Sequence, residues 1–152
     1  LAGALGDGLR AVVVSIIGVI YWRILKTPAV RTVLSWGVWS SAWMIVLSFV
    51  AALVWADWGI HINHAFFING IVLLSLLVAT RVIQSHGPKR PELENTKSLA
   101  IVAILVFLAA VTRISAYVLP ESYLSYLAYS ALMLSLGVGF WGVVYLPFVR
   151  VR

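Results

Sequence analysis

Long runs of apolar residues, separated by short polar or proline-containing segments, dominate the chain. The clearest run covers residues 64–83, about twenty nearly unbroken apolar side chains, which is the length that an α-helix needs to cross a bilayer. Comparable runs cover residues 33–55, 97–119 and 123–146. A further run, interrupted by Asp7 and Arg10, reaches spanning length only if it extends over residues 2–25. The pattern predicts an all-α integral membrane protein, a bundle of about five transmembrane helices in one domain.

Composition supports a membrane protein and excludes several kinds of site. Hydrophobic residues make up 62% of the chain and charged residues only 11%, whereas about a quarter of a soluble domain is charged. Lys and Arg outnumber Asp and Glu by 11 to 5. We attribute this excess to cytoplasmic loops, so the expected partner is the lipid bilayer and not nucleic acid. The absence of cysteine excludes disulfides, thiolate metal sites, iron–sulfur clusters and covalent c-type haem.

The basic residues also predict the topology. They lie in the segments after the first and third expected helices and in the tail, whereas the two other turns contain none. The positive-inside rule then predicts an outside N-terminus and a cytoplasmic C-terminus in a multi-pass inner-membrane protein. The chain starts at Leu1 without the basic region of a signal peptide. We therefore expect an N-terminal part of a longer protein to precede it.

All three histidines flank the helix expected at residues 64–83. His61 and His64 are three residues apart, so a helical turn places them on one face at the outer end. Imidazole is a common ligand of haem iron and copper, which makes both side chains candidate metal ligands. The alternative is that they bond lipid headgroups or loop carbonyls at the interface. His86 would lie about 33 Å from His64 along a helix, so these two cannot share a metal.

Two arginines are further candidate site residues. Arg113 would lie about 24 Å along its helix from Lys97, inside the outer half of the membrane, where a cation needs a partner from another segment, from a cofactor or from water. It shares this side of the membrane with His61 and His64, which favours a single outer site. Arg81 lies near the cytoplasmic end. It either extends to lipid phosphate or holds a haem propionate or another anion.

Other residues are more typical of packing. Trp36, Trp39 and Trp43 form a stripe that either packs and anchors its helix or lines a haem or quinone. Three glycines at 137, 139 and 142 favour close helix contact. The chain has no Walker loop, dinucleotide fingerprint or nucleophile elbow, and no acid–base pair is evident. The sequence therefore supports no statement about catalysis.

The run HAFFINGIVLLSLLVATRVIQSHGPKRP, starting at His64, resembles the signature of the NnrS family. In that family a helix opens with His-Ala, closes with Thr-Arg and enters a Gly-His-Thr-Gly-Arg-Pro-like loop. The flanking segments LKTPAVRTVLSWGVWSSAWMIVLSF and TRISAYVLPESYLSYLAYSALMLSLGVGFWGVVYLPFVR are similar to neighbouring helices of those proteins. The loop here departs from the pattern, because it has an extra residue and Ser85 in place of the glycine before His86.

The resemblance implies a membrane protein that binds haem and copper and is linked to nitric-oxide metabolism. It directs attention to His64, Arg81, His86 and Arg113. Family members are longer, so the resemblance also implies a C-terminal portion or a shortened relative that is completed by further membrane helices, from the same protein or from a partner subunit.

Three hypotheses follow. The first is a haem-binding, and also copper-binding, membrane protein connected with the nitric-oxide response or respiratory redox chemistry. In it, His64 and His61 are the metal ligands, and Arg113, Arg81 and His86 are further cofactor-binding residues. The second is a cofactor-free accessory subunit packed against a larger respiratory or photosynthetic complex. The third is a transporter, although five spans show no evident inverted repeat.

Overall fold

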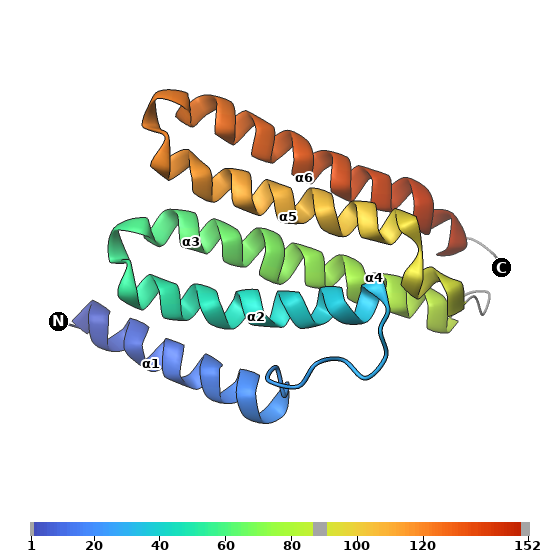
Figure 1. The fold of residues 1–152 in the computed structure, drawn as a ribbon, viewed down its shortest axis with the longest axis horizontal. Helices are drawn as coiled ribbons and strands as arrows, with labels where there is room; N and C mark the ends of the chain where they lie inside the picture. The colour runs from blue at the N-terminus through green and yellow to red at the C-terminus, as the bar shows by residue number, and fades with distance from the viewer. Residues whose placement is uncertain (1, 87–90, 150–152) are drawn as a thin grey trace.

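Helices account for nearly all of residues 2–86 and 91–149, which the computed structural model describes (Figure 1). The first half contains α1 (Ala2–Ile16), η1 (Ile17–Tyr21), α2 (Val33–Val54), η2 (Ala56–Trp58), α3 (Gly59–Ala65), η3 (Phe66–Val72) and α4 (Leu73–His86). The second half contains η4 (Pro91–Asn95), α5 (Lys97–Val118), η5 (Pro120–Ser122), α6 (Tyr123–Tyr145) and η6 (Leu146–Val149). No strand occurs in either described range, which confirms the all-α prediction.

Within these ranges, four helices are long and apolar enough to cross a membrane: Val33–Val54, Gly59–His86, Lys97–Val118 and Pro120–Val149. Each corresponds to a predicted span, although the second begins earlier than the predicted residue 64 because α3 already includes both outer histidines. The first helical stretch ends at Tyr21 instead of residue 25. Shortly beyond it, Arg23 has a φ of 52°, a left-handed conformation that cannot continue a right-handed helix. A fifth span at this position and the orientation of the termini stay predictions.

Polar residues fix the start of α2 and α5 at the same end of the bundle. The hydroxyls of Thr32 and Thr96 accept hydrogen bonds from the backbone N–H groups of Ser35 and Leu99, at 3.2 and 3.1 Å. These threonines are N-caps, which satisfy N–H groups that have no partner within their helix. The side chain of Asn95 also accepts a hydrogen bond from the backbone of Val33, at 3.2 Å. The turn before α5 is thereby joined to the start of α2.

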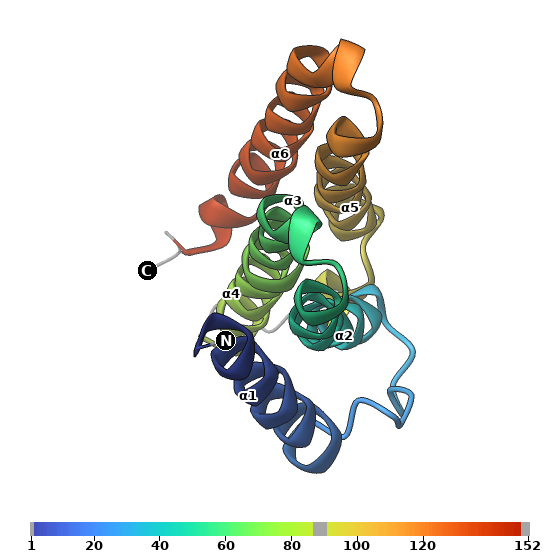
Figure 2. The ribbon, with the colours of Figure 1, turned by 90° about the vertical axis from the view of Figure 1, so that its left-hand side faces the viewer.

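The helices form an antiparallel bundle in which α5 and α6 make a hairpin and α1 packs against α2 (Figures 1 and 2). The main core lies between α4, α5 and α6 and includes Leu77, Leu99, Val102 and Val106, all fully buried. Interhelical hydrogen bonds cross this core. The indole of Trp141 donates to the hydroxyl of Thr80 at 2.8 Å, and the hydroxyl of Ser130 donates to the carbonyl of Ala109 at 2.8 Å.

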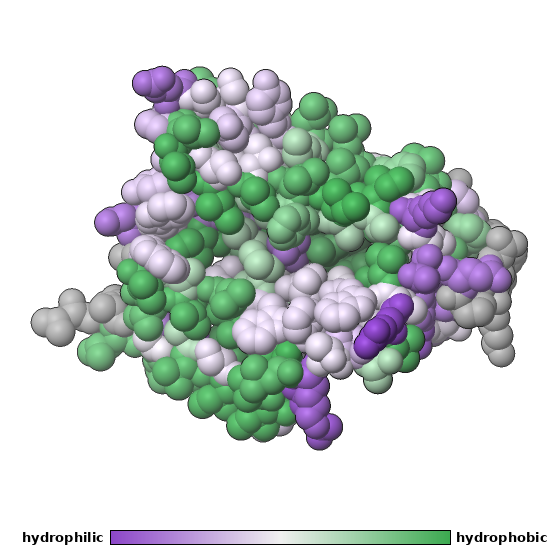
Figure 3. All heavy atoms as spheres, viewed as in Figure 1, coloured by the Kyte–Doolittle hydropathy of each residue, from purple (hydrophilic) through white to green (hydrophobic). Residues whose placement is uncertain are grey.

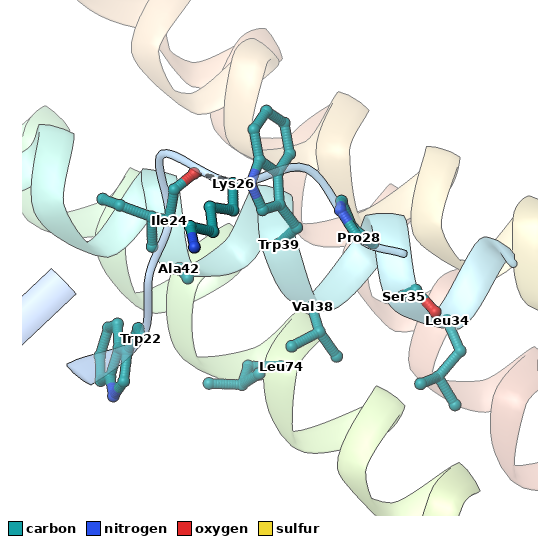
Figure 4. Close-up of a pocket in the computed structure, with 10 residues that line it drawn as sticks. All are labelled: Trp22, Ile24, Lys26, Pro28, Leu34, Ser35, Val38, Trp39, Ala42 and Leu74. Atoms are coloured by element: carbon teal, nitrogen blue, oxygen red, sulfur yellow. Dashed lines mark hydrogen bonds between the residues drawn. The ribbon is translucent and has the colours of Figure 1, made fainter. Parts of the chain in front are cut away.

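The tryptophan stripe of α2 holds the segment that precedes it. The indole N–H groups of Trp39 and Trp43 both donate to the carbonyl of Ile24, at 2.8 and 3.0 Å. Consecutive rings from Trp36 to Trp43 meet edge to face, with centroids 5.3 and 6.1 Å apart. A cavity of about 580 Å³ lies beside this attachment, lined by Trp22, Ile24, Trp39 and neighbours from α2 and α4 (Figure 4). Packing and anchoring therefore account for most of the stripe.

Glycine allows close approach at two helix contacts, between α2 and α4 and between α5 and α6, but not at every predicted position. A Cβ atom on Gly37 of α2 would lie 2.6 Å from Cδ1 of Leu77 in α4, and Leu77 is fully buried. In α6, a Cβ atom on Gly137 would lie 3.3 Å from Leu105 of α5, whereas Gly139 has open space around it. Gly137 thus packs as predicted, and Gly139 has no such contact among the described residues.

Gly37→Ala should lower the thermal midpoint of the detergent-solubilised protein, because overpacking against the fully buried Leu77 costs about 1–3 kcal/mol. Gly139→Ala is the matched control in open space, where the better helix propensity of alanine adds up to about 1 kcal/mol. Circular dichroism melts would compare the two variants. Equal midpoints would contradict the close contact between α2 and α4.

The predicted topology can be tested by labelling single cysteines, since the chain has none of its own. Asp57 in η2 and Glu92 in η4 are exposed at opposite ends of the bundle. A membrane-impermeant maleimide added to spheroplasts should label Asp57→Cys directly, and Glu92→Cys only after the membrane is permeabilised. The reverse pattern would show an inside N-terminus.

Candidate functional site

Five side chains meet at the end of the bundle that carries the turns η2 and η5: His61, His64, Arg113, Tyr117 and Tyr123, here called the histidine cluster. The two histidines come from α3, Arg113 and Tyr117 come from the last turns of α5, and Tyr123 begins α6. Their proximity follows from topology, because the C-terminal end of α5 and the N-terminal ends of α3 and α6 lie at the same end of an antiparallel bundle (Figure 1).

The hydrogen bonds of His64 define which ring nitrogen carries the proton. Its Nδ1 lies 2.6 Å from the carbonyl oxygen of Ile60, one turn earlier in the helix. Since a carbonyl can only accept, Nδ1 must carry the proton and donate it. Nε2 of the neutral ring is then an acceptor, and Nη2 of Arg113 donates to it at 3.3 Å. A histidine held by Nδ1–H to a carbonyl, with its Nε2 lone pair facing outward, is the form that ligates metals.

His61 repeats this arrangement one turn earlier. Its Nδ1 lies 3.4 Å from the backbone carbonyl of Arg113, so this nitrogen also donates to a carbonyl. The ring is 8% exposed, and its centroid lies 5.1 Å from the ring of Tyr117 and 6.4 Å from that of Tyr123. Nε2 of His61 makes no hydrogen bond with any residue in the described ranges. Both imidazoles therefore carry their lone pair on Nε2, which in His64 accepts from Arg113 and in His61 has no hydrogen bond among the described residues.

Arg113 lacks a carboxylate partner anywhere in the part of the chain that the structure describes. Its guanidinium contacts the imidazole of His64 and lies 6.0 Å from the centroid of the Tyr123 ring. Its Nη1 is buried and has no hydrogen-bond acceptor among the described residues. A buried donor without an acceptor is energetically costly. The sequence predicted a partner from another segment, and His64 is one, but the cation still has unused donors.

Arg81 and His86 lie at the opposite end of the bundle and are not brought together with the histidine cluster. Arg81 pairs with the carboxylate of Glu94 from η4 and donates to the side chain of Gln84 at 3.3 Å. Sequence reasoning considered lipid phosphate or a propionate for this arginine and overlooked the acid that follows in η4. His86 is exposed, and its Nδ1 bonds the carbonyl of Val82 at 3.1 Å. The family-like loop at residues 87–90 lies outside the described ranges.

Sequence analysis did not predict the π-helical turn that follows the histidines. η3 (Phe66–Val72) widens the helix directly after Ala65 and contains Asn69, which is 1% exposed. The Oδ1 atom of Asn69 has no hydrogen-bond partner in the described ranges. Short π-helical turns occur frequently at functional sites. The available signal was one asparagine inside an otherwise apolar run.

The donor set suits some metal centres better than others. No group of three or more His, Asp or Glu side chains gathers within the described ranges, and the chain has no cysteine. Each imidazole presents one Nε2 lone pair, and haem iron takes one or two axial ligands from the protein, so a single histidine from this cluster would meet the minimum requirement of a haem. A copper ion would have the same two nitrogens and would need its remaining ligands from other groups.

Comparison with known families identifies one match. The family model described as NnrS protein matches residues 2–152, almost the entire chain. The match includes α1 and every candidate membrane span. No curated protein and no solved structure matches the chain.

Proposed function

The chain belongs to the NnrS family, which is linked to the nitric-oxide response, and we propose that it is a haem-binding membrane protein with His64 as an axial ligand. The multi-pass helices agree with a membrane location, and we propose the bacterial inner membrane. We also propose that further membrane helices, from the same protein or a partner subunit, complete the site. A bound haem would supply an iron centre that can bind nitric oxide.

The observation that carries this proposal is the hydrogen bonding of His64. Its Nδ1–H is held by the carbonyl of Ile60, and among the described residues its Nε2 lone pair accepts a hydrogen bond from the guanidinium of Arg113 alone, at 3.3 Å. This long hydrogen bond is weaker than one at 2.9 Å and is easily replaced. The backbone bond fixes the ring in the tautomer that coordination requires. His64 is therefore prepared to give its lone pair to iron.

Arg113 has the charge and the free donors to hold a carboxylate. If Nε2 of His64 held iron, the guanidinium would need another acceptor, and its Nη1 has none among the described residues. The planar fork of an arginine pairs with a carboxylate through two parallel hydrogen bonds. We assign Arg113 to a haem propionate. Arg81 already pairs with the carboxylate of Glu94, so we propose only a secondary role in cofactor binding for it, at the cytoplasmic end.

Copper is the second cofactor implied by the family. His61 offers the same kind of nitrogen as His64, at a buried position beside two tyrosine rings. Imidazole is a good copper ligand. We propose that His61 takes part in copper binding, with its remaining ligands supplied from outside the described residues.

The visible spectrum and metal content of the detergent-purified protein test the haem assignment. Wild type should show a Soret band and bound iron, and His64→Ala should lose most of both, because the axial nitrogen is removed. His86→Ala is the matched control, since His86 makes the same Nδ1-to-carbonyl bond at the other end of the bundle. It should keep the wild-type spectrum.

A colourless, metal-free wild-type preparation would contradict haem binding by this chain. It would favour the alternative of a cofactor-free accessory subunit. A Soret band unchanged in His64→Ala would instead show that another residue ligates the haem iron.

Arg113→Met should reduce the haem-to-protein ratio while the haem that remains keeps the band positions of wild type, because the axial nitrogen is still present. A lost charge-assisted pair of this kind is worth about 1.5–3 kcal/mol, roughly tenfold to a hundredfold in haem affinity. Arg113→Lys should be intermediate, since lysine keeps the charge and loses the fork. Haem transfer to apomyoglobin measures the affinity. Equal transfer rates in wild type and Arg113→Met would show that Arg113 does not hold a haem propionate.

A further inference from the structure

A groove separate from the histidine cluster runs between α2 and α5. Its volume is about 530 Å³, and η3 and the start of α4 form its floor. Figure 3 shows this face of the molecule, which is hollowed between the two helices. The walls are largely apolar and include three aromatic rings, Trp36, Trp39 and Phe107. The groove is open along this face, so molecules dissolved in the bilayer can enter it from the side.

Asn69 is the polar residue at the floor of this groove. It is 1% exposed, and the Oδ1 atom of its carboxamide has no hydrogen-bond partner in the described ranges. It lies about 15 Å along the helix from Gly59, within the span Gly59–His86 and hence at membrane depth. Lipid tails offer no hydrogen bonds, so an unpaired polar group at this depth is costly. A ligand that forms a hydrogen bond with this carboxamide would remove that cost.

The charge distribution limits the chemistry of that ligand. Among the residues that line the groove, Arg31 alone is charged, and it precedes α2 at the end near Thr32 and Asn95. Nothing charged lies beside Asn69 on the floor. A group that reaches Asn69 should therefore be neutral, because a charge at this depth would be left without a counter-ion.

We propose that this groove binds a membrane quinol, with a ring hydroxyl paired to Asn69. One hydroxyl can donate to Oδ1 and accept from one amide N–H at once, so it gives the unpaired oxygen a donor. Aromatic walls suit a flat ring. A lipid acyl chain would fill the groove and leave Asn69 unpaired. The oxidised quinone has no hydroxyl, so it accepts from the amide nitrogen and leaves Oδ1 without a donor.

The proposal concerns binding and does not depend on the haem assignment. Asn69 and His64 are five residues apart, about 8 Å along the helix, and the groove contains no residue of the histidine cluster. His64→Ala should therefore keep quinol binding, and loss of quinol binding should leave the Soret band unchanged. The two proposals can fail separately.

The test is an anaerobic calorimetric titration of the detergent-solubilised full chain with decylubiquinol. Wild type should show saturable binding. Asn69→Leu, which removes the carboxamide and keeps its branched shape, should weaken it roughly tenfold or more, because the ring hydroxyl is then buried without a partner. Asn63→Leu is the matched control, since Asn63 is exposed on the same helix outside the groove. It should bind like wild type, and decylubiquinone should bind wild type more weakly than decylubiquinol.

A thermal melt of the ligand-free variants provides the second readout. Asn69→Leu should raise the thermal midpoint, because leucine replaces an unpaired polar group among apolar neighbours. Affinity equal to wild type in Asn69→Leu, equal affinity for the two redox forms, or uptake that never saturates would each overturn the proposal.

Discussion

The structure depends on one constraint: inside a bilayer, every buried polar group must find its partner within the protein. Side chains meet this demand across helices. Trp141 pairs with Thr80, Ser130 bonds the carbonyl of Ala109, and two tryptophans share the carbonyl of Ile24. Each bond also fixes the position of one helix relative to another, which apolar contact with lipid-like neighbours cannot do alone. The hydrogen bonds between polar residues therefore determine how the helices are arranged, whereas the apolar contacts alone do not select one arrangement.

The exceptions to this constraint are informative for the same reason. Buried atoms without hydrogen bonds in the described ranges include Nη1 of Arg113, Oδ1 of Asn69 and Oγ of Ser41. The first belongs to the histidine cluster, and the second lines the groove between α2 and α5. Proteins retain such costly groups mainly where a ligand or a reaction uses them. Nothing in the structure explains Ser41.

Much of the fold could be predicted from the sequence, because the bilayer demands long apolar runs and the four candidate spans coincide with them. The contact between Arg113 and His64 was also predictable, because both residues were expected in the outer half of the membrane. The pairing of Arg81 with Glu94 was not, because it depends on how η4 folds back on α4. The π-helical turn was equally hidden: it changes the direction of side chains such as Asn69 without changing hydrophobic periodicity enough to be recognised.

The two outer histidines differ in what holds them, and this difference argues for separate roles. His64 bonds the carbonyl of Ile60 in its own helix, so its ring can exchange Arg113 for another partner without disturbing the contact between helices. His61 bonds the backbone carbonyl of Arg113 in α5, so it ties α3 to the helix that carries the cation. Any ligand that moves the Arg113 side chain therefore acts on His64 directly and on His61 only through the α5 backbone. His64 is therefore the histidine whose side-chain partner can change, and His61 is the one that links α3 to α5.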